Sequence, residues 1–371
     1  MRILIPLFLL LPKFGFVDFG ILFLFFYVVF FRKLRISLDV GLVLILIIIG
    51  LALVSSIFSG GVITAEYVLK PVRLLLVYVL AKSCVPFNVQ SFVEGLSAAV
   101  IINSLLIYFQ FLGSMYGFDV YYNPDFFDNH NIIYRQPGFF AGYPEHSILL
   151  AMSLVLSFSY SKRCFYALVL VALPSAIFSG RTGVYSLLLG LLITSFFSAF
   201  FTLKGALRIS TLVAILCASF LFISSHKHHL HPQVSFALEH VLLPLEGLMS
   251  GRMGDYSTED LLQNHYKFPD DITTLLVGNS LPPFEGGVES DVSIIRILYG
   301  NGIFSLLLYL ILFLYFSIHF LTSPRGMARE SFILCLIFLI ALLKGPFLFS
   351  RVVGDAFLLS AIVFSSVNRR A

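Results

Sequence analysis

Arginine side chains recur near the ends of the long apolar segments of this sequence of 371 residues. They are Arg73 in EYVLKPVRLLL, Arg135 in IIYRQPGFFAGYPEH, Arg181 in FSGRTG, Arg296 in VSIIRILYG and Arg351 in LFSRVVGD. An arginine keeps its charge in a medium of low dielectric constant and binds phosphate through paired hydrogen bonds. Charged groups near or inside a membrane are costly and therefore point to function. Several arginines at one membrane surface predict a site for a lipid-linked phosphate or pyrophosphate.

Each arginine also has a purely structural interpretation. Arg181 and Arg351 fit interfacial anchors, whose aliphatic stems lie along lipid while the charged group reaches the headgroups. Arg296 fits an ion pair with an acid inside the membrane, and Arg135 fits a solvated loop position. Arg73 fits a topology or packing feature. The sequence leaves both interpretations open for all five.

A group-transfer reaction also needs a side chain that accepts or orients a proton. The candidates are Asp291, Glu145, His146, His265 and Glu289. Asp291 ranks first because it precedes Arg296 in the string GGVESDVSIIRILYGNG, at a predicted membrane edge. Its alternative role is to cap the helix that follows, which Asp291 and Ser290 both suit.

The sequence contains no recognisable metal site. The histidines of SSHKHHLHPQ fit no defined ligand spacing and have no adjacent cysteine or glutamate. The four cysteines stand singly, without a CxxC pair. We therefore expect chemistry that needs neither a metal nor another cofactor.

These residues belong to an unusually apolar chain. It is 58% hydrophobic and 12% charged, with a mean hydropathy of +0.95, whereas soluble domains carry roughly 25% charged residues. A soluble globular protein is therefore excluded, and a scattered net charge of +4 gives no sign of a nucleic-acid partner. We predict an all-α polytopic membrane protein with about twelve transmembrane helices (11–13). The apolar segments lie near 3–12, 16–31, 38–58, 66–81, 91–113, 146–160, 165–178, 183–201, 209–224, 292–321, 331–349 and 352–367.

The distribution of lysine and arginine predicts the orientation of these segments. Short loops rich in both residues, among them those of Arg35 and Lys82, fall on one side, which places both termini in the cytoplasm. Arg73 and Arg351 fall toward the opposite, extracytoplasmic side. Two long loops, 114–145 and 225–291, are then extracytoplasmic. Within the second, helical spacing of apolar residues predicts an interfacial helix, or a lid, near 232–250. Residues 1–371 thus form a single predicted membrane domain with an extracytoplasmic cap. In the segment 292–321, the glycine pair Gly300 and Gly302 predicts a bend or a close contact with another helix.

Three strings carry a resemblance to a known family: RQPGFFAGYPEHSILLAMSL, SGRTGVYSLLLGLL and VESDVSIIRILYGNGIFSLLLY. Together with the topology, they make the chain similar to the O-antigen polymerases of the Wzy type and to the related O-antigen ligases. The resemblance implies a metal-independent glycosyltransferase at the periplasmic face of the bacterial inner membrane. Its donor and acceptor would both be undecaprenyl-pyrophosphate-linked oligosaccharides. A chain-length regulator and a flippase would be its protein partners.

The resemblance also implies roles for individual residues. The donor pyrophosphate would be held by Arg135, Arg181 and Arg296, with Arg73 and Arg351 as further candidates. Their charge would stabilise the leaving group as the glycosidic bond breaks. The proton of the acceptor hydroxyl would pass to Asp291, Glu145 or His146.

Three other functions compete with a polymerase. Ligases resemble one another in a histidine near the start of the helix after the large loop, where this chain has Ser290-Asp291-Val292-Ser293. A transporter or flippase of lipid-linked sugars comes from another class, but the sequence has no paired halves of the kind transporters show. A membrane protein without chemistry would not need Arg296 inside a helix. The polymerase is therefore preferred.

Overall fold

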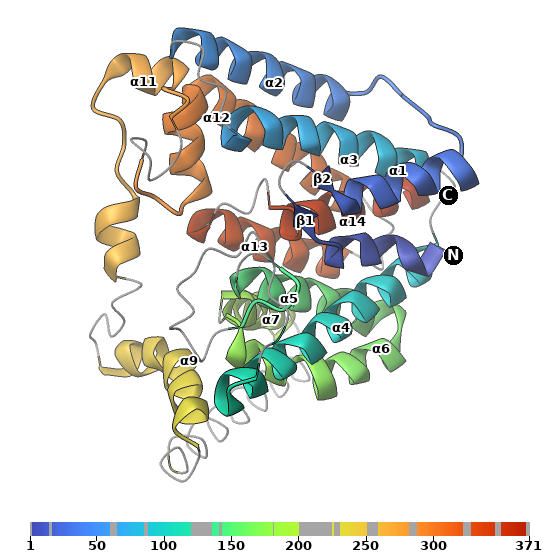
Figure 1. Ribbon diagram of the computed structural model, residues 1–371, viewed down its shortest axis with the longest axis vertical. Helices are drawn as coiled ribbons and strands as arrows, with labels where there is room; N and C mark the ends of the chain where they lie inside the picture. Colours follow the sequence, from blue (N-terminus) through green and yellow to red (C-terminus); the bar gives the residue numbers. More distant parts are fainter. Residues whose placement is uncertain are drawn as a thin grey trace. The chain divides into compact units, whose positions relative to one another are not determined.

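The computed structural model describes residues 2–14, 17–59, 65–84, 88–118, 120, 136–140, 143–180, 182–199, 225, 231–250, 259–281, 288–321, 328–345 and 350–368. Most of these residues are helical (Figure 1). Within these ranges the strands are β1 (Lys13–Phe14) and β2 (Val17–Asp18), each two residues long, which pair with each other. The prediction of an all-α protein is confirmed for this part of the chain. The predicted segment 209–224 and most of loop 114–145 lie outside the described residues.

Within the described ranges, three helices are long and apolar enough to cross a membrane: α2 (Val40–Phe58), α4 (Val89–Tyr116) and α12 (Ser293–Leu321). Three shorter helices are also apolar, and they are α1 (Phe19–Phe31), α13 (Ala328–Lys344) and α14 (Val353–Asn368). The first predicted segment forms a 3-10 helix, Arg2–Leu10. At a rise of about 2 Å per residue it is shorter than the hydrocarbon core of about 30 Å. The count of about twelve spans stays a prediction.

Large apolar side chains on α1 and α2 point away from the protein. Phe30 is 72% exposed and Ile57 is 74% exposed, and each has similar neighbours on its helix. In water a surface of this kind favours association, whereas in a bilayer it meets lipid tails at no cost. The exposed faces therefore agree with a membrane protein.

Contacts within the chain divide it into two compact units. Unit 1 consists of Met1–Leu9, Asp18–Phe92 and Ser257–Ala371, and unit 2 consists of Leu10–Val17 and Val93–Tyr256. The prediction of a single membrane domain, 1–371, stays a prediction.

Unit 1 is built around α12. This helix packs against α2, α13 and α14, while α2 and α1 both pack against α3 (Lys70–Cys84), which follows a π-helical turn, Ala65–Leu69 (Figure 1). Stacked rings join three of these helices: Phe357 of α14 lies 4.1 Å from Phe338 of α13 and 5.8 Å from Phe313 of α12, between ring centroids. Aromatic contact thus joins α12, α13 and α14.

Polar contacts join the start of α2 to the end of α3. Asp39 caps α2 by accepting the amide N–H of Leu42 at 2.9 Å, and it forms an ion pair with Lys82. Its carboxylate also accepts the hydroxyl of Tyr78 at 2.7 Å. The backbone N–H of Arg35 donates to the hydroxyl of Ser83 at 2.9 Å.

A break interrupts α12 at Gly302, which has φ 76° and ψ 178°. The short helix α11 (Ile272–Val277) packs into the break. The amide of Asn279 donates to the carbonyl of Tyr299 at 2.7 Å, and the amide of Ser280 donates to that of Gly300 at 3.1 Å. Carbonyls that the break frees from the helix are therefore satisfied by the chain after α11.

Both glycines of the predicted pair allow close packing. A Cβ on Gly302 would lie 2.2 Å from the carbonyl oxygen of Leu276, and one on Gly300 would lie 2.2 Å from the ring of Tyr67. The prediction that this pair bends the helix or admits a close contact is confirmed in both respects.

Unit 2 contains α4, α5 (Tyr143–Tyr160) and α7 (Thr182–Ala199), and α5 packs against α7. The predicted segment 165–178 forms α6 (Lys162–Ala167), a π-helical turn, Leu168–Ala172, and a 3-10 turn, Pro174–Phe178. Pro174 begins the 3-10 turn. Because proline lacks the N–H that a continuous α-helix needs, a regular α-helix does not continue through this residue. The predicted helix near 232–250 is present as α9 (Pro232–Ser250). Its position at a membrane interface stays a prediction.

We predict that Gly302→Ala destabilises the protein, because alanine disfavours this backbone conformation by about 1–3 kcal/mol and its Cβ would meet the main chain of Leu276. The matched control is Gly50→Ala in α2, where a Cβ meets nothing within 4 Å and alanine should stabilise the helix by about 0.5–1 kcal/mol. Thermal unfolding in detergent, followed by a thiol-reactive dye that reports the buried Cys84, measures both. Equal unfolding temperatures for the two variants would contradict the prediction.

Candidate functional site

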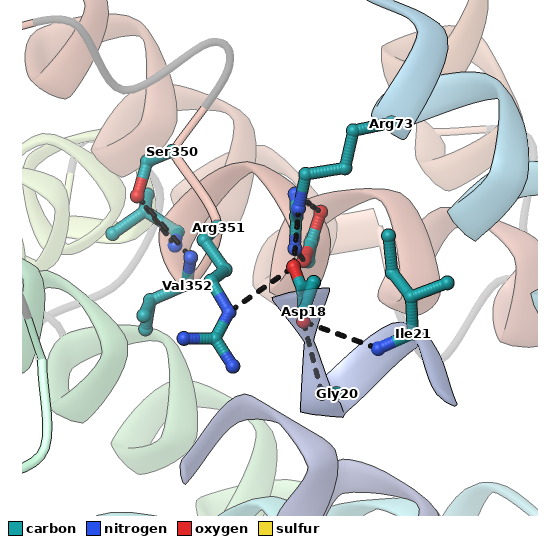
Figure 2. Close-up of polar contacts among 9 residues, drawn as sticks. Asp18, Gly20, Ile21, Arg73, Ser350, Arg351 and Val352 are labelled. Carbon is teal, nitrogen blue, oxygen red and sulfur yellow. Dashed lines mark hydrogen bonds and ion pairs between the residues drawn. The ribbon is translucent and has the colours of Figure 1, made fainter. Parts of the chain in front are cut away.

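Two of the predicted arginines lie together in unit 1, around Asp18 (Figure 2). The Nε of Arg73 donates to Oδ2 of Asp18 at 2.8 Å, and the Nε of Arg351 lies 3.3 Å from the same oxygen. The two terminal nitrogens of Arg73 bind the two oxygens of Asp355, at 3.0 and 2.5 Å. Two arginines and two carboxylates thus form a four-charge cluster without net charge.

The ends of two helices hold the carboxylates of this cluster. Asp18 is the N-cap of α1, and its Oδ1 accepts the amides of Gly20 at 2.9 Å and Ile21 at 3.2 Å (Figure 2). Asp355 lies in the first turn of α14, and its side chain is 1% exposed. The partial positive charge at a helix N-terminus favours a carboxylate in both positions.

The paired carboxylates favour a structural role for Arg73. Its three guanidinium nitrogens all contact carboxylate oxygens, so binding a pyrophosphate would require breaking a buried two-point ion pair. The residue instead joins α1, α3 and α14. Sequence reasoning missed Asp18 and Asp355. A signal was present, because each is an acid inside an apolar stretch, FVDFG and VVGDAF, and such an acid needs a partner.

Asp291 and Arg296, predicted separately as base and anion ligand, form an ion pair. The Nη2 of Arg296 lies 3.0 Å from Oδ1 of Asp291, and its Nε donates to the carbonyl of Ser290. The hydroxyl of Ser290, and not the carboxylate of Asp291, accepts the amide of Val292, at 3.1 Å. The Asp291 side chain is 58% exposed and that of Arg296 is 13% exposed. The carboxylate is thus open to a substrate beside a largely buried guanidinium.

His265 connects the large loop to the start of α12. Its Nδ1 accepts the amide N–H of Asp291 at 2.8 Å, and its carbonyl accepts the hydroxyl of Ser290 at 2.7 Å. Because an amide can only donate, Nδ1 is the acceptor, so in the neutral ring Nε2 carries the proton. Nε2 lies 3.2 Å from Oδ2 of Asp260. Hydrogen bonds from the Asn264 amide and then from His265 lower the pKa of the Asp260 carboxyl, which keeps it in the accepting form.

A small apolar cluster lies beside these polar contacts. It consists of Val288, Val292 and Ile295, with Leu261 and Tyr266 packed against it. The segment around His265 is therefore docked on the start of α12 by apolar contact as well as by hydrogen bonds. This surface was not anticipated from the sequence, because its two halves are separated by residues of a predicted long loop.

Unit 2 joins two of the strings that carry the family resemblance. The amide of Gln136, in RQPGFF, donates to the carbonyl of Phe178, next to SGRTG, at 2.6 Å. The side chain of Gln110 binds Gly138 twice, by accepting its amide at 2.8 Å and donating to its carbonyl at 3.0 Å. Gly138 has φ 69°, which favours glycine. We call these contacts, together with those of Asn103, His146 and Gly183, the motif network.

His146 is fully buried in the motif network. Its Nδ1 lies 2.9 Å from the amide nitrogen of Asn103, whose Oδ1 accepts the amide of Phe139 at 2.6 Å. Its Nε2 lies 2.7 Å from the hydroxyl of Ser175, and that hydroxyl donates to the carbonyl of Ala172. Both ring nitrogens are therefore used within the protein. This geometry favours a positioning role for His146 over proton acceptance.

The first turns of α5 and α7 meet at Gly183. Its amide lies 3.2 Å from the hydroxyl of Ser147, and a Cβ on Gly183 would lie 2.0 Å from the carbonyl oxygen of Ser147. Glu145, in the same turn of α5, is buried. Arg135 and Arg181 lie outside the described residues, but Gln136 and Gly183, which stand close to them in sequence, belong to this network.

The structure thus brings Arg73 together with Arg351, and Asp291 together with Arg296, in unit 1. Glu145 and His146 belong to unit 2. Asn103 and Gln110, which hold the motif network, were not predicted, because a single amide inside an apolar helix gives no indication of its partner. Comparison with known protein families and with curated proteins finds no match to this chain.

We predict that Asn103→Ala destabilises unit 2, because it removes two hydrogen bonds inside the protein. The amide of Phe139 loses its acceptor, Oδ1 of Asn103, and the ring of His146 loses its contact with the side-chain amide of Asn103. Each unmet buried group costs about 1–3 kcal/mol. The matched control is Ser97→Ala, a buried residue of the same helix whose hydroxyl donates to the carbonyl of Val93 in its own helix. Thermal unfolding in detergent, followed by the loss of helical circular dichroism, should separate the two variants. An Asn103→Ala protein as stable as Ser97→Ala would show that the motif network does not stabilise unit 2.

We predict that Arg73→Leu is strongly destabilising, by about 3–5 kcal/mol, because it leaves the buried Asp355 uncompensated. The double variant Arg73→Leu with Asp355→Leu should recover most of the stability, since Asp18 keeps Arg351. Arg35→Leu, an exposed arginine in a loop, is the control for loss of a cation. Thermal unfolding of the three proteins decides the matter, and a double variant no better than the single one would be the contrary result.

Proposed function

We propose that the chain is a surface-polysaccharide polymerase of the Wzy type, a membrane glycosyltransferase that joins undecaprenyl-pyrophosphate-linked oligosaccharide units. The observation that carries the proposal is the motif network. RQPGFFAGYPEHS and SGRTG are separate in sequence, yet hydrogen bonds and a glycine contact join residues in or next to them within unit 2. A shared role for Arg135 and Arg181 follows naturally, because residues close to both in sequence are packed into one arrangement.

In the proposed reaction, the bond between the anomeric carbon of the donor sugar and the pyrophosphate oxygen breaks. The acceptor hydroxyl oxygen forms a new bond to the same carbon, and undecaprenyl pyrophosphate leaves. Arg135, Arg181 and Arg296 would bind the pyrophosphate and offset its growing charge. Asp291 would take the hydroxyl proton, since its carboxylate is exposed and lies beside Arg296. No metal ion enters this scheme.

Two separate groups of contacts in unit 1 support the proposed orientation. Arg73 and Arg351, which the charge pattern assigns to extracytoplasmic ends, meet at Asp18. Arg35 and Lys82, which it assigns to the cytoplasmic side, contact residues at the other end of α3. The grouping is what two opposite faces at the two ends of α3 would give, and we propose cytoplasmic termini and a periplasmic active face in a bacterial inner membrane. A chain-length regulator and a flippase would be the protein partners.

A transporter or flippase of lipid-linked sugars is the second candidate, because α12 is discontinuous at Gly302. Broken helices in transporters expose backbone groups to a substrate or an ion. Here the carbonyls of Tyr299 and Gly300 accept the amides of Asn279 and Ser280. The break therefore serves the packing of α11, and the polymerase remains preferred. An O-antigen ligase is the third candidate.

The test is complementation of a bacterial host that makes the cognate lipid-linked repeat unit but lacks its polymerase. Wild type should restore a ladder of polysaccharide lengths, while Arg296→Ala, Arg181→Ala and Asp291→Ala should leave a single repeat unit at equal membrane expression. Arg35→Ala is the control, because its side chain is exposed in a loop of the opposite predicted face. Attachment without a change of length would favour the ligase. Wild-type rescue of unit export alone would favour the transporter.

A further inference from the structure

The position of Asp291 is fixed by a residue far from it in sequence. His265 precedes Asp291 by 26 positions, yet it contacts two consecutive residues at the start of α12. Its Nδ1 accepts the backbone amide of Asp291 and its own carbonyl accepts the side-chain hydroxyl of Ser290. Two contacts on neighbouring residues thus hold this segment against His265.

The ring of His265 is itself held by a third contact. Asp260 lies on the same helical segment and contacts Nε2 at 3.2 Å, so the ring presents Nδ1 toward α12. The carboxylate of Asp260 also accepts the side-chain amide of Asn264 at 2.7 Å, which orients it. A carboxylate behind a histidine ring commonly fixes which nitrogen carries the proton.

The contacts of Arg296 pass through the same backbone. Its Nε donates to the carbonyl of Ser290, and its Nη2 pairs with the carboxylate of Asp291. Displacing this backbone would therefore move the proposed proton acceptor and the proposed pyrophosphate ligand together. Within the described part of the loop, His265 is the residue of segment 259–266 that contacts both Ser290 and Asp291.

The same geometry argues against His265 as a base in its own right. Its Nδ1 lone pair is occupied by a main-chain amide, and its Nε2 faces a carboxylate. An acceptor hydroxyl would have to displace one of these partners before it could transfer a proton. The carboxylate of Asp291 pairs with Arg296 through Oδ1, but its side chain is 58% exposed, so a hydroxyl can approach it from outside the protein.

We propose that His265 is a positioning residue for glycosyl transfer, which holds Asp291 and, through the same backbone, Arg296 in the arrangement that the reaction needs. The proposal rests on the polymerase function proposed above. It assigns the segment 259–266 of the large loop a task in catalysis, through its contacts with the start of α12.

Two substitutions separate the contacts of His265. Asparagine places a carbonyl oxygen where Nδ1 lies, so His265→Asn keeps an acceptor for the amide of Asp291 and loses Asp260. Glutamine places its amide near the position of Nε2, so His265→Gln keeps Asp260 and loses Asp291. His231→Ala, an exposed histidine elsewhere in the same loop, is the control. All variants are first matched for thermal stability and membrane expression.

The first readout is hydrogen exchange of the purified protein in detergent, measured by mass spectrometry on peptides that contain Asp291. Loss of one hydrogen bond should speed exchange of this amide about fivefold in His265→Gln, with little change in His265→Asn or His231→Ala. The second readout is the polysaccharide ladder in the complemented host. We expect it to shorten to one or a few units in His265→Gln and to stay near wild type in His265→Asn.

The outcomes distinguish the two proposals. Unchanged exchange in His265→Gln overturns the contact and therefore the positioning role. Faster exchange with a normal ladder overturns the role in catalysis, although the contact exists. A ladder shortened in His265→Asn and normal in His265→Gln would assign the function to the contact with Asp260 and overturn the proposal. A ladder shortened in both variants would assign it to the imidazole ring itself and likewise overturn the proposal. Wild type that builds no ladder overturns the polymerase function, and the positioning role with it, while exchange still decides the contact.

Discussion

A polar group inside a lipid-embedded protein has no water to form hydrogen bonds with, so its hydrogen-bond partner must come from the chain itself. This constraint accounts for most of the polar contacts described above. The four-charge cluster balances two arginines with two carboxylates, and the motif network uses every hydrogen-bonding atom of a buried histidine ring. At the break in α12 the freed carbonyls are taken by the chain that follows α11. Each solution joins segments that are distant in sequence, and this is what organises each unit.

The same constraint explains how much could be predicted from the sequence. Apolar length and helical spacing predicted the all-α class and the helix α9, because both are local properties. The glycine pair of α12 was also interpreted correctly, since glycine marks a bend or a close contact from its own chemistry. The contact between Asp291 and Arg296 is also local, because the two residues stand less than two helical turns apart in sequence. A contact of this kind is one that a sequence can suggest.

Contacts between distant residues could not be predicted. Arg73 was interpreted as a pyrophosphate candidate because its charge is visible in the sequence, whereas its pairing with Asp355 depends on how α3 and α14 meet. Asn103 and Gln110 gave no signal, since their partners are backbone groups of a loop. His265 was noticed as a candidate base, but only its contacts with Asp260 and Asp291 give it a specific role. The number of spans and the roles of Arg135 and Arg181 remain predictions.

The four-charge cluster has a consequence for the order in which the protein is made. Asp18 and Arg73 leave the ribosome well before Arg351 and Asp355, because synthesis proceeds from the N-terminus. Until α14 arrives, Arg73 has Asp18 as its partner from this cluster, and the buried two-point pair with Asp355 does not yet exist. Until α14 has been made, the early helices therefore stay in the membrane while the charge of Arg73 is only partly paired. Arg73 would then lie near the headgroups or contact the insertion machinery. Docking of α14 then serves as the step that commits unit 1 to its final assembly.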